Sequence, residues 1–153
     1  RRAIAVPSPS GTPFCQADAA RFAALDRVIF VCGHYEGIDD RLASLYSVEE
    51  YSLGDFVVTG GEIPALAMMD ATVRLLAGAL RPESLESESF SGSLLDYPSF
   101  TRPPVFRGVA VPEVLLSGDH ARIAEWRREQ SRRRTAIRRR DLLDDALHPE
   151  ERP

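Results

Sequence analysis

The sequence predicts an α/β domain built on an open parallel sheet, followed by a smaller helical domain. Within the first eighty residues, stretches of strand length alternate with stretches of helical spacing. Residues 28–32 form a continuous apolar run, which is typical of a parallel strand covered on both faces. Glycine-rich loops follow the strands, at the end of the sheet where such proteins bind ligands.

The first domain is expected in the order strand, turn, helix, strand, loop, helix, strand. These elements are placed at residues 3–6, 7–11, 17–25, 28–32, 33–39, 39–45 and 47–51.

A second glycine-bounded stretch covers residues 53–64. Residues 56–59 are expected to form a short buried strand between two glycine turns. Pro64 is expected at the first position of a helix over residues 65–77, where its missing N–H costs nothing. The pair Gly60 and Gly61 permits positive φ and lets a ligand approach bare backbone. A tight connection with no ligand is the favoured interpretation of an isolated Gly-Gly, and the similar stretch upstream at residues 33–39 favours a ligand site instead. Neither loop has the spacing of a dinucleotide or P-loop motif.

The character of the chain changes after Gly78. Residues 80–96 are rich in serine and glutamate and indicate an exposed, flexible linker, which separates domains at 1–79 and 97–153. Ser117 or Asp119 is expected to cap a helix to about Arg134, with arginines on its exposed face. Ile123 and Trp126 mark the buried face of this helix, and a short helix is expected from Asp141.

Composition indicates a soluble globular protein, with 44% hydrophobic and 27% charged residues. No apolar run is long enough to span a membrane, no signal peptide pattern is present, and a cytoplasmic location is expected. Two cysteines without metal spacing indicate reduced structural thiols, and no protein metal site is expected. The net charge is −4, yet residues 119–140 carry nine arginines against three acidic residues. That segment predicts a local polyanion site and not a general coating of DNA.

Residues 32–39 (CGHYEGID) and 53–62 (LGDFVVTGGE) together resemble the bacterial tRNA (guanine-N1)-methyltransferase family. That family modifies the guanosine immediately 3′ of the anticodon. Further matching stretches follow in the family's order across nearly the whole chain, at residues 89–90, 101–103, 114–120, 126–127 and 130–131.

The resemblance implies a SPOUT-type parallel sheet with a carboxyl-terminal trefoil knot and a small helical domain that grips tRNA. It also implies S-adenosylmethionine as methyl donor and a homodimer with active sites at the subunit interface. The residues that match the family's cofactor site are Pro9, Gly33, Tyr35, Glu36, Leu53, Gly54, Asp55, Phe56, Val57, Val58, Gly60, Gly61 and Pro64. A Mg²⁺ ion shared between Glu36 and substrate oxygens is a further expectation.

Methylation of guanine N1 requires a general base and a cation that stabilises charge developing on the purine. The resemblance places Arg74 in the second role, although an arginine on a helix surface is the alternative. Glu88 stands where the family has aspartate, so it is the candidate base with one additional methylene group. Glu83 and Glu86 are interpreted as solvated linker residues.

The residues that match the family's tRNA contacts are Ser89, Arg102, Ser117, Gly118, His120, Arg127 and Arg128. His34 and His148 have no partner spacing and receive no role. The family extends before Arg1 and beyond Pro153, so the chain is expected to lack the family's amino-terminal part. A catalytically impaired tRNA-binding fragment and a knotted methyltransferase with another RNA target are the alternative functions.

Overall fold

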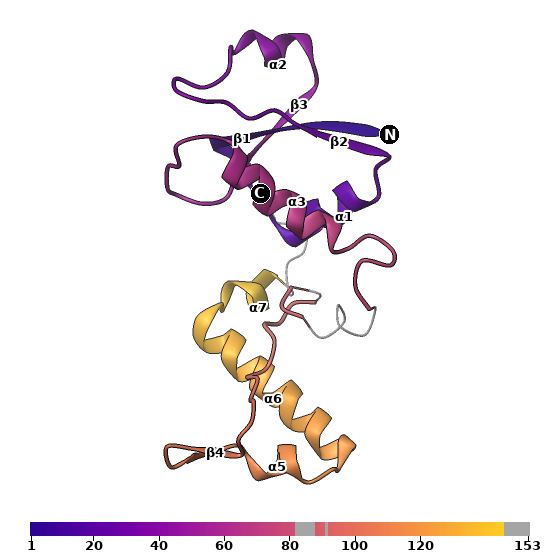
Figure 1. The fold of residues 1–153 in the computed structure, drawn as a ribbon, viewed down its shortest axis with the longest axis vertical. Helices are drawn as coiled ribbons and strands as arrows, with labels where there is room; N and C mark the ends of the chain where they lie inside the picture. The colour runs from indigo at the N-terminus through magenta and orange to yellow at the C-terminus, as the bar shows by residue number, and fades with distance from the viewer. Residues whose placement is uncertain (82–87, 91, 146–153) are drawn as a thin grey trace. The chain divides into compact units, whose positions relative to one another are not determined.

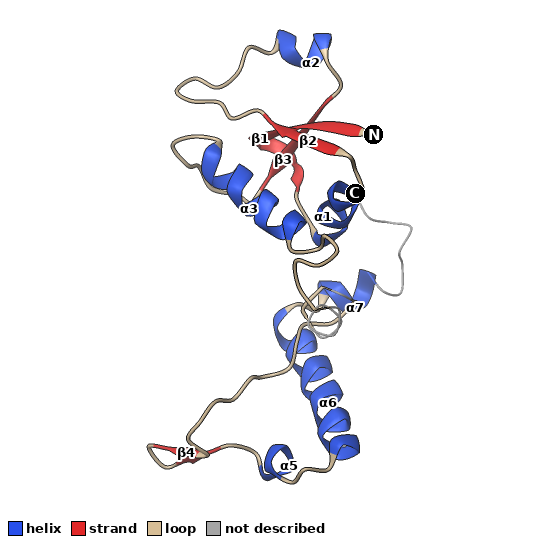
Figure 2. Ribbon diagram, turned by 45° about the vertical axis from the view of Figure 1, so that its right-hand side comes forward, coloured by secondary structure: helices blue, strands red, loops and turns tan. Residues whose placement is uncertain are grey.

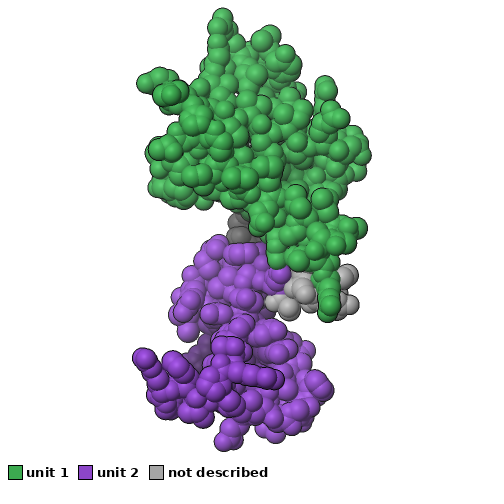
Figure 3. Space-filling model, viewed as in Figure 1, with its two compact units in different colours: residues 1–82 green, residues 83–153 purple. Residues whose placement is uncertain are grey.

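The computed structural model describes residues 1–81, 88–90 and 92–145. The chain forms two compact units, Arg1–Pro82 and Glu83–Pro153, which Figure 3 shows in different colours. Each unit is described by itself.

The first unit is built on a three-stranded sheet (Figure 1). Its strands are β1 (Arg2–Pro13), β2 (Arg27–Phe30) and β3 (Val48–Ser52), arranged in the order β2-β1-β3. Both pairings are parallel. The predicted α/β fold with a parallel sheet is therefore confirmed.

Three helices accompany this sheet: α1 (Gln16–Ala23), α2 (Arg41–Leu45) and α3 (Glu62–Val73). In both ribbon views α1 and α3 lie side by side against the strands, and α2 lies beyond the opposite side (Figures 1 and 2). The chain passes from β1 to β2 in one direction and from β2 to β3 in the other. Because parallel crossovers are right-handed, this reversal sends the two connections to opposite faces.

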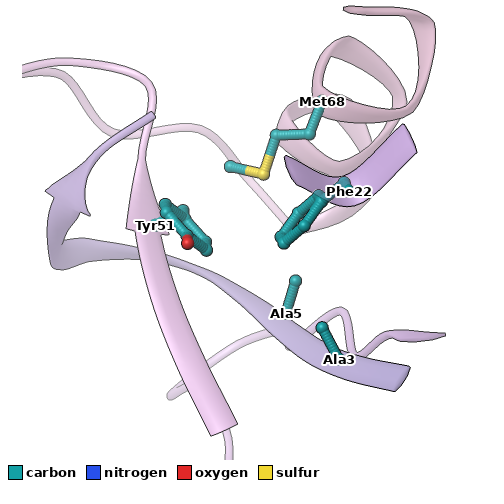
Figure 4. Packing of buried hydrophobic residues seen from close by; sticks show 5 residues of the cluster. All are labelled: Ala3, Ala5, Phe22, Tyr51 and Met68. Atoms are coloured by element: carbon teal, nitrogen blue, oxygen red, sulfur yellow. The ribbon is translucent and has the colours of Figure 1, made fainter. Parts of the chain in front are cut away.

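The core of the first unit lies between the sheet and the helices α1 and α3 (Figure 4). Phe22 from α1 and Met68 from α3 are almost fully buried and meet Tyr51 from β3. Ala3 and Ala5 on β1 are small, so the helices approach the central strand closely. Burial of each large side chain contributes about 1.5–3 kcal/mol.

Strand β1 continues through the residues for which a turn was predicted. Both Pro7 and Thr12 are opposite Tyr51, so residues 8–11 bulge out of the strand. A proline has no N–H to donate to a ladder, which favours a bulge at this place. The prediction that a turn at residues 7–11 ends the strand was therefore wrong, because the strand resumes after the bulge.

Residues 56–59 do not form the predicted buried strand. Phe56 is 58% exposed and Val57 is 83% exposed. The backbone turns sharply here, since the N–H of Phe56 donates to the carbonyl of Gly54 at 2.9 Å and Gly54 has a φ of +148°. This apolar segment therefore forms a loop and not a strand.

Two further expectations need correction in the first unit. Ile29 on β2 is 40% exposed, so the prediction that this strand is covered on both faces was wrong for the described residues. Helix α3 begins at Glu62, which places Pro64 at the third helical position instead of the first. Its missing N–H still costs nothing, because the first four N–H groups of a helix have no intrahelical partner.

The second unit contains a hairpin of β4 (Val105–Phe106) and β5 (Val109–Ala110), followed by α5 (Glu113–Leu116), α6 (His120–Arg138) and α7 (Asp141–Asp145). The hairpin and α5 were not predicted, because elements of two to four residues have no measurable periodicity. Positive φ at Arg107 and Gly108 matches the type I′ turn that two-residue hairpins favour.

Helix α6 begins as predicted, with Asp119 accepting a hydrogen bond from the N–H of Arg122 at 3.1 Å. It extends to Arg138, four residues beyond the predicted end. Thr135 on its inner face is fully buried, and its hydroxyl oxygen accepts the N–H of Leu95 at 2.9 Å. Residues 95 and 96 therefore pack on this helix.

Candidate functional site

A cleft of about 460 Å³ lies at the carboxyl ends of the three parallel strands. Residues 8–10 form one wall within the bulge of β1, residues 33–39 follow β2, and residues 53–61 follow β3. The connections that leave β1 and return past it run to opposite sides of this central strand. Open α/β sheets form a ligand-binding crevice at such a point, outside the carboxyl ends of the strands. Three segments that are distant in the sequence thus make one concave surface.

The residues predicted to bind a cofactor gather in this cleft. All of them except Asp55 line it, namely Pro9, Gly33, Tyr35, Glu36, Leu53, Gly54, Phe56, Val57, Val58, Gly60, Gly61 and Pro64. Asp55 is exposed and does not contribute to the lining.

The two adjacent glycines are required by the close approach of two loops. A Cβ at Gly61 would lie 2.9 Å from Cα of Cys32, and the N–H of Gly61 donates to the carbonyl of Gly33 at 3.0 Å. A Cβ at Gly60 would lie 2.8 Å from Cε1 of His34. The Gly-Gly pair therefore makes a tight connection and lines the cleft as well, so the two interpretations of this motif are not exclusive.

His34 joins the cleft to the beginning of α3, although the sequence assigned it no role. Its Nε2 atom lies 2.6 Å from Oε1 of Glu62. A hydrogen bond from the backbone N–H of Glu62 itself, and then the bond to His34, lower the pKa of the Glu62 carboxyl. Sequence reasoning missed this pair because its members are 28 positions apart and share no motif.

The charged side chains that line the cleft are carboxylates: Glu36, Asp39, Asp40 and Glu50. The side chain of Arg41 bonds Asp39 and holds the pKa of that carboxyl below its usual range. Apolar walls come from Leu53 and Val58. Such a cleft favours a ligand with an apolar body and positive charge, and it disfavours free phosphates.

Cys32 lies beneath the glycine pair. Burial, and then the charge of Glu62, raise the pKa of its thiol. Since the thiolate is the reactive form, Cys32 has the properties of an unreactive structural thiol. Both cysteines are free of disulfides.

Arg74 and Glu88 lie in different units, and the structure does not place these units relative to each other. Arg74 is the carboxyl-terminal cap of α3. Glu88 lines a hollow of about 480 Å³ in the second unit, together with Arg127 and Arg128. Glu83 and Glu86 lie outside the described residues.

An arginine-rich surface lies along α6 and the extended segment of residues 97–102. The guanidinium of Arg127 stacks 4.6 Å from the ring centroid of Tyr97. Arg127 and Arg102 line a second hollow of about 600 Å³ with Phe100. Arginine and aromatic side chains arranged in this way suit phosphate contact and base stacking.

Not every predicted tRNA-contacting residue has a free side chain. The hydroxyl of Ser117 donates to the carbonyl of Val114 at 2.8 Å, and that of Ser89 donates to Asp96 at 3.0 Å. Gly118 has a φ of +75° and makes the turn into α6. His120 is exposed at the first position of that helix.

The expected division of α6 into an apolar face and a basic face is only partly present. Arg134 donates to the carbonyl of Asp96 at 3.2 Å, on the same side of the helix as buried Thr135. Arg127 likewise faces Tyr97. Arginine side chains thus contribute to the packing of the second unit, through the apolar part of the side chain and through the N–H groups of the guanidinium.

A profile of the family described as tRNA (Guanine-1)-methyltransferase TrmD matches residues 1–145. The chain belongs to this family. Among the relatives, the tRNA (guanine-N(1)-)-methyltransferase of Desulfitobacterium hafniense is 56% identical over 144 residues, which are 94% of this chain and 55% of the relative. The corresponding enzyme of Thermomicrobium roseum is 52% identical over 140 residues, covering 92% of this chain and 52% of the relative.

A third tRNA (guanine-N(1)-)-methyltransferase, from Rhodococcus jostii, is 54% identical over 145 residues and is covered over 63% of its length. The chain therefore spans between about half and just under two thirds of these TrmD relatives. Among the described residues, no helix is long and apolar enough to cross a membrane. Within the same residues, no cluster of three or more His, Cys, Asp or Glu side chains is arranged to hold a metal ion.

Proposed function

We propose that this chain is the S-adenosylmethionine-binding and tRNA-binding part of a tRNA (guanine-N1)-methyltransferase. The reaction transfers a methyl group to N1 of the guanosine immediately 3′ of the anticodon. The observation that carries the proposal is the cleft at the strand ends, which gathers nearly all residues that match the family's cofactor site. Membership in the TrmD family and the names of the relatives support the reaction.

The cleft fits S-adenosylmethionine in its chemistry. This cofactor supplies an electrophilic methyl group on a sulfonium ion when it is bound. Gly54, Gly60 and Gly61 bring bare backbone to the lining of the cleft, and Leu53 and Val58 offer apolar contact to the faces of an adenine. The lining carboxylates, including Glu36, attract the positive charges of the sulfonium and amino groups.

Glu88 is the proposed general base and Arg74 the proposed electrostatic catalyst. Glu88 would accept the proton from guanine N1, and Arg74 would stabilise the negative charge that develops on the purine. Arg74 belongs to the first unit and Glu88 to the second. A Mg²⁺ ion held by Glu36 and substrate oxygens is a further part of this proposal.

The second unit is the proposed tRNA-binding unit. Arg102, Arg127 and Arg128 are positioned around two hollows there, and α6 adds further arginines. The remaining proposed contacts are Ser89, Ser117, Gly118 and His120. Because the substrate is tRNA, we place the activity in the cytoplasm.

We further propose the SPOUT trefoil knot and the homodimer of the family for the complete protein. Support for a subunit interface comes from α3, on which Ile63, Leu66 and Val73 recur at helical spacing and are 61%, 60% and 53% exposed. A stripe of this kind on a monomer is an uncovered contact surface.

The test is transfer of a labelled methyl group to a tRNA transcript, with a second transcript that carries adenosine in place of the target guanosine. Transfer to the first transcript alone establishes both reaction and position. Transfer to both transcripts would indicate a different RNA target. Retention of cofactor binding without transfer would indicate a tRNA-binding fragment impaired in catalysis.

A further inference from the structure

We propose that Glu62 is a positioning residue for the cofactor cleft, acting through His34. The inference rests on the proposed function, because it concerns how the same cleft is kept in its binding shape. Glu62 does not line the cleft, whereas His34 does. The role of Glu62 is to hold the loop of residues 33–39 against the beginning of α3.

Contacts at three successive residues join these segments. The Nε2 atom of His34 lies 2.6 Å from Oε1 of Glu62. The N–H of Gly61 donates to the carbonyl of Gly33 at 3.0 Å, and His34 forms an isolated β-bridge with Gly60. The side-chain pair therefore continues a short backbone junction into the first residue of α3.

The glycine at position 60 provides space for this pair. A Cβ there would lie 2.5 Å from Oε2 of Glu62 and 2.8 Å from Cε1 of His34. Both distances are shorter than real Cβ contacts, so the carboxylate and the imidazole fill the space above this glycine. A side chain at position 60 would displace one member of the pair.

The hydrogen bond between the pair sets the orientation of the imidazole ring and the tautomer of its neutral form. The lowered pKa of Glu62 keeps its carboxylate ionised at neutral pH, where it can only accept hydrogen bonds. Nε2 of His34 must therefore carry the proton that it donates to Glu62. In the neutral ring, Nδ1 is then left as an acceptor, so Glu62 determines the tautomer as well as the orientation of a residue that lines the cleft.

Stability alone does not account for the pair. The side chains of His34 and Glu62 are 55% and 52% exposed, and exposed ion pairs add little to the stability of a fold. Glu62 also lies in the first turn of α3, where a carboxylate interacts favourably with the helix dipole. The experiment must separate this local helix effect from the contact with His34.

The experiment compares Glu62→Ala, Glu62→Gln, His34→Ala, His34→Gln and the double alanine variant in the 153-residue chain. Asp70→Asn removes a carboxylate from the exposed surface of the same helix and is the matched control. Three quantities are measured: the Kd for S-adenosylmethionine by calorimetry, the hydrogen-exchange rate of the Gly61 amide, and the thermal unfolding midpoint.

We expect Glu62→Ala to raise the Kd about tenfold, the size of effect that one charged hydrogen bond carries. The Gly61 amide should exchange faster, while the unfolding midpoint should stay close to that of Asp70→Asn. His34→Gln retains an N–H donor and should recover part of the affinity lost in His34→Ala. The double variant should bind no more weakly than either single alanine variant, because each single variant already removes the same contact between His34 and Glu62.

A double variant whose loss in affinity equals the sum of the two single losses would overturn the proposal, since Glu62 would then act through the helix dipole. Equal Gly61 exchange in Glu62→Ala and Asp70→Asn would overturn it as well. If the unaltered chain does not bind S-adenosylmethionine, the proposed function fails. The exchange rate of the Gly61 amide still decides in that case whether Glu62 holds the junction.

Discussion

Tyr51 places its hydroxyl among charged side chains at the edge of the buried core. It donates to Glu49 at 2.9 Å and accepts from Arg21 at 2.7 Å, while its ring packs against Phe14 and Phe22. Burial, and then the hydrogen bond to Glu49, raise the pKa of Tyr51 from 10.0 to about 12. The folded state therefore holds the phenolic proton more tightly than the unfolded state.

The sign of this shift predicts a loss of stability in alkali. The contribution of the Tyr51 proton is fully present below pH 10 and is lost as the pH rises towards about 12. Tyr51→Phe should unfold at lower denaturant concentration at pH 8, and its stability should decline less between pH 10 and 12. Chemical denaturation at several pH values measures both effects. Parallel curves for the two proteins across this range would contradict the assignment.

Thr135 has a similar structural role in the second unit. Its hydroxyl donates to the carbonyl of Ser131 at 2.7 Å and accepts the N–H of Leu95 at 2.9 Å. Thr135→Val preserves the shape and leaves the Leu95 N–H without this partner, so we expect a loss of about 1–3 kcal/mol in unfolding free energy. Ala136→Val, at a neighbouring exposed position of the same helix, is the control for the introduced valine. Equal denaturation midpoints for the two variants would refute this role.

At the scale of elements, the bulge in β1 depends on one glycine. A Cβ at Gly11 would lie 2.4 Å from the backbone N of Tyr51 and 2.5 Å from the carbonyl carbon of Glu50. These are backbone atoms of the adjacent strand, which cannot turn aside as a flexible side chain would. Gly11 is thus where β1 and β3 meet again after the bulge.

Gly11→Ala should therefore lower the unfolding free energy by about 3 kcal/mol, the upper end of the usual cost of overpacking. Gly92→Ala is the control, because a Cβ there meets no atom within 4 Å. The measurement is urea denaturation of both variants followed by circular dichroism. A Gly11→Ala variant as stable as the control would show that the strands separate at this point without cost.

At the scale of the whole molecule, the two units carry different electrostatics. The cleft of the first unit is lined by carboxylates, whereas α6 in the second unit carries a run of arginines. This division suits one cationic small molecule and one polyanion. It also explains how a chain with a net charge of −4 can offer a local site for a polyanion.

The proposed binding of tRNA should accordingly weaken as salt concentration increases. Arg127→Gln should reduce the slope of log K against log salt by about one, because one phosphate contact is lost. Arg27→Gln removes the same charge from an exposed position on β2 of the first unit, and it should leave the slope nearly unchanged. Fluorescence anisotropy with a labelled tRNA at several salt concentrations measures both slopes. Equal slopes for Arg127→Gln and the unaltered chain would exclude Arg127 from phosphate contact.

The sequence by itself determined the parallel strands, the glycine loops at their ends and the helix that begins after Asp119. These features depend on local spacing and capping, which a short window of residues displays. Local spacing gave a wrong prediction at residues 56–59, because a short apolar run has the same pattern whether it forms a buried strand or a loop that lines an open cleft. The family motifs predicted candidate cofactor residues without showing how these residues come together.

Only the tertiary structure decided which distant residues meet. His34 and Glu62 are 28 positions apart, and Leu95 and Thr135 are 40 positions apart. Such contacts depend on strand register and on the path of the chain between elements, which no local pattern encodes. For the same physical reason, a cleft made from three strand ends has no signature in any single stretch of this sequence.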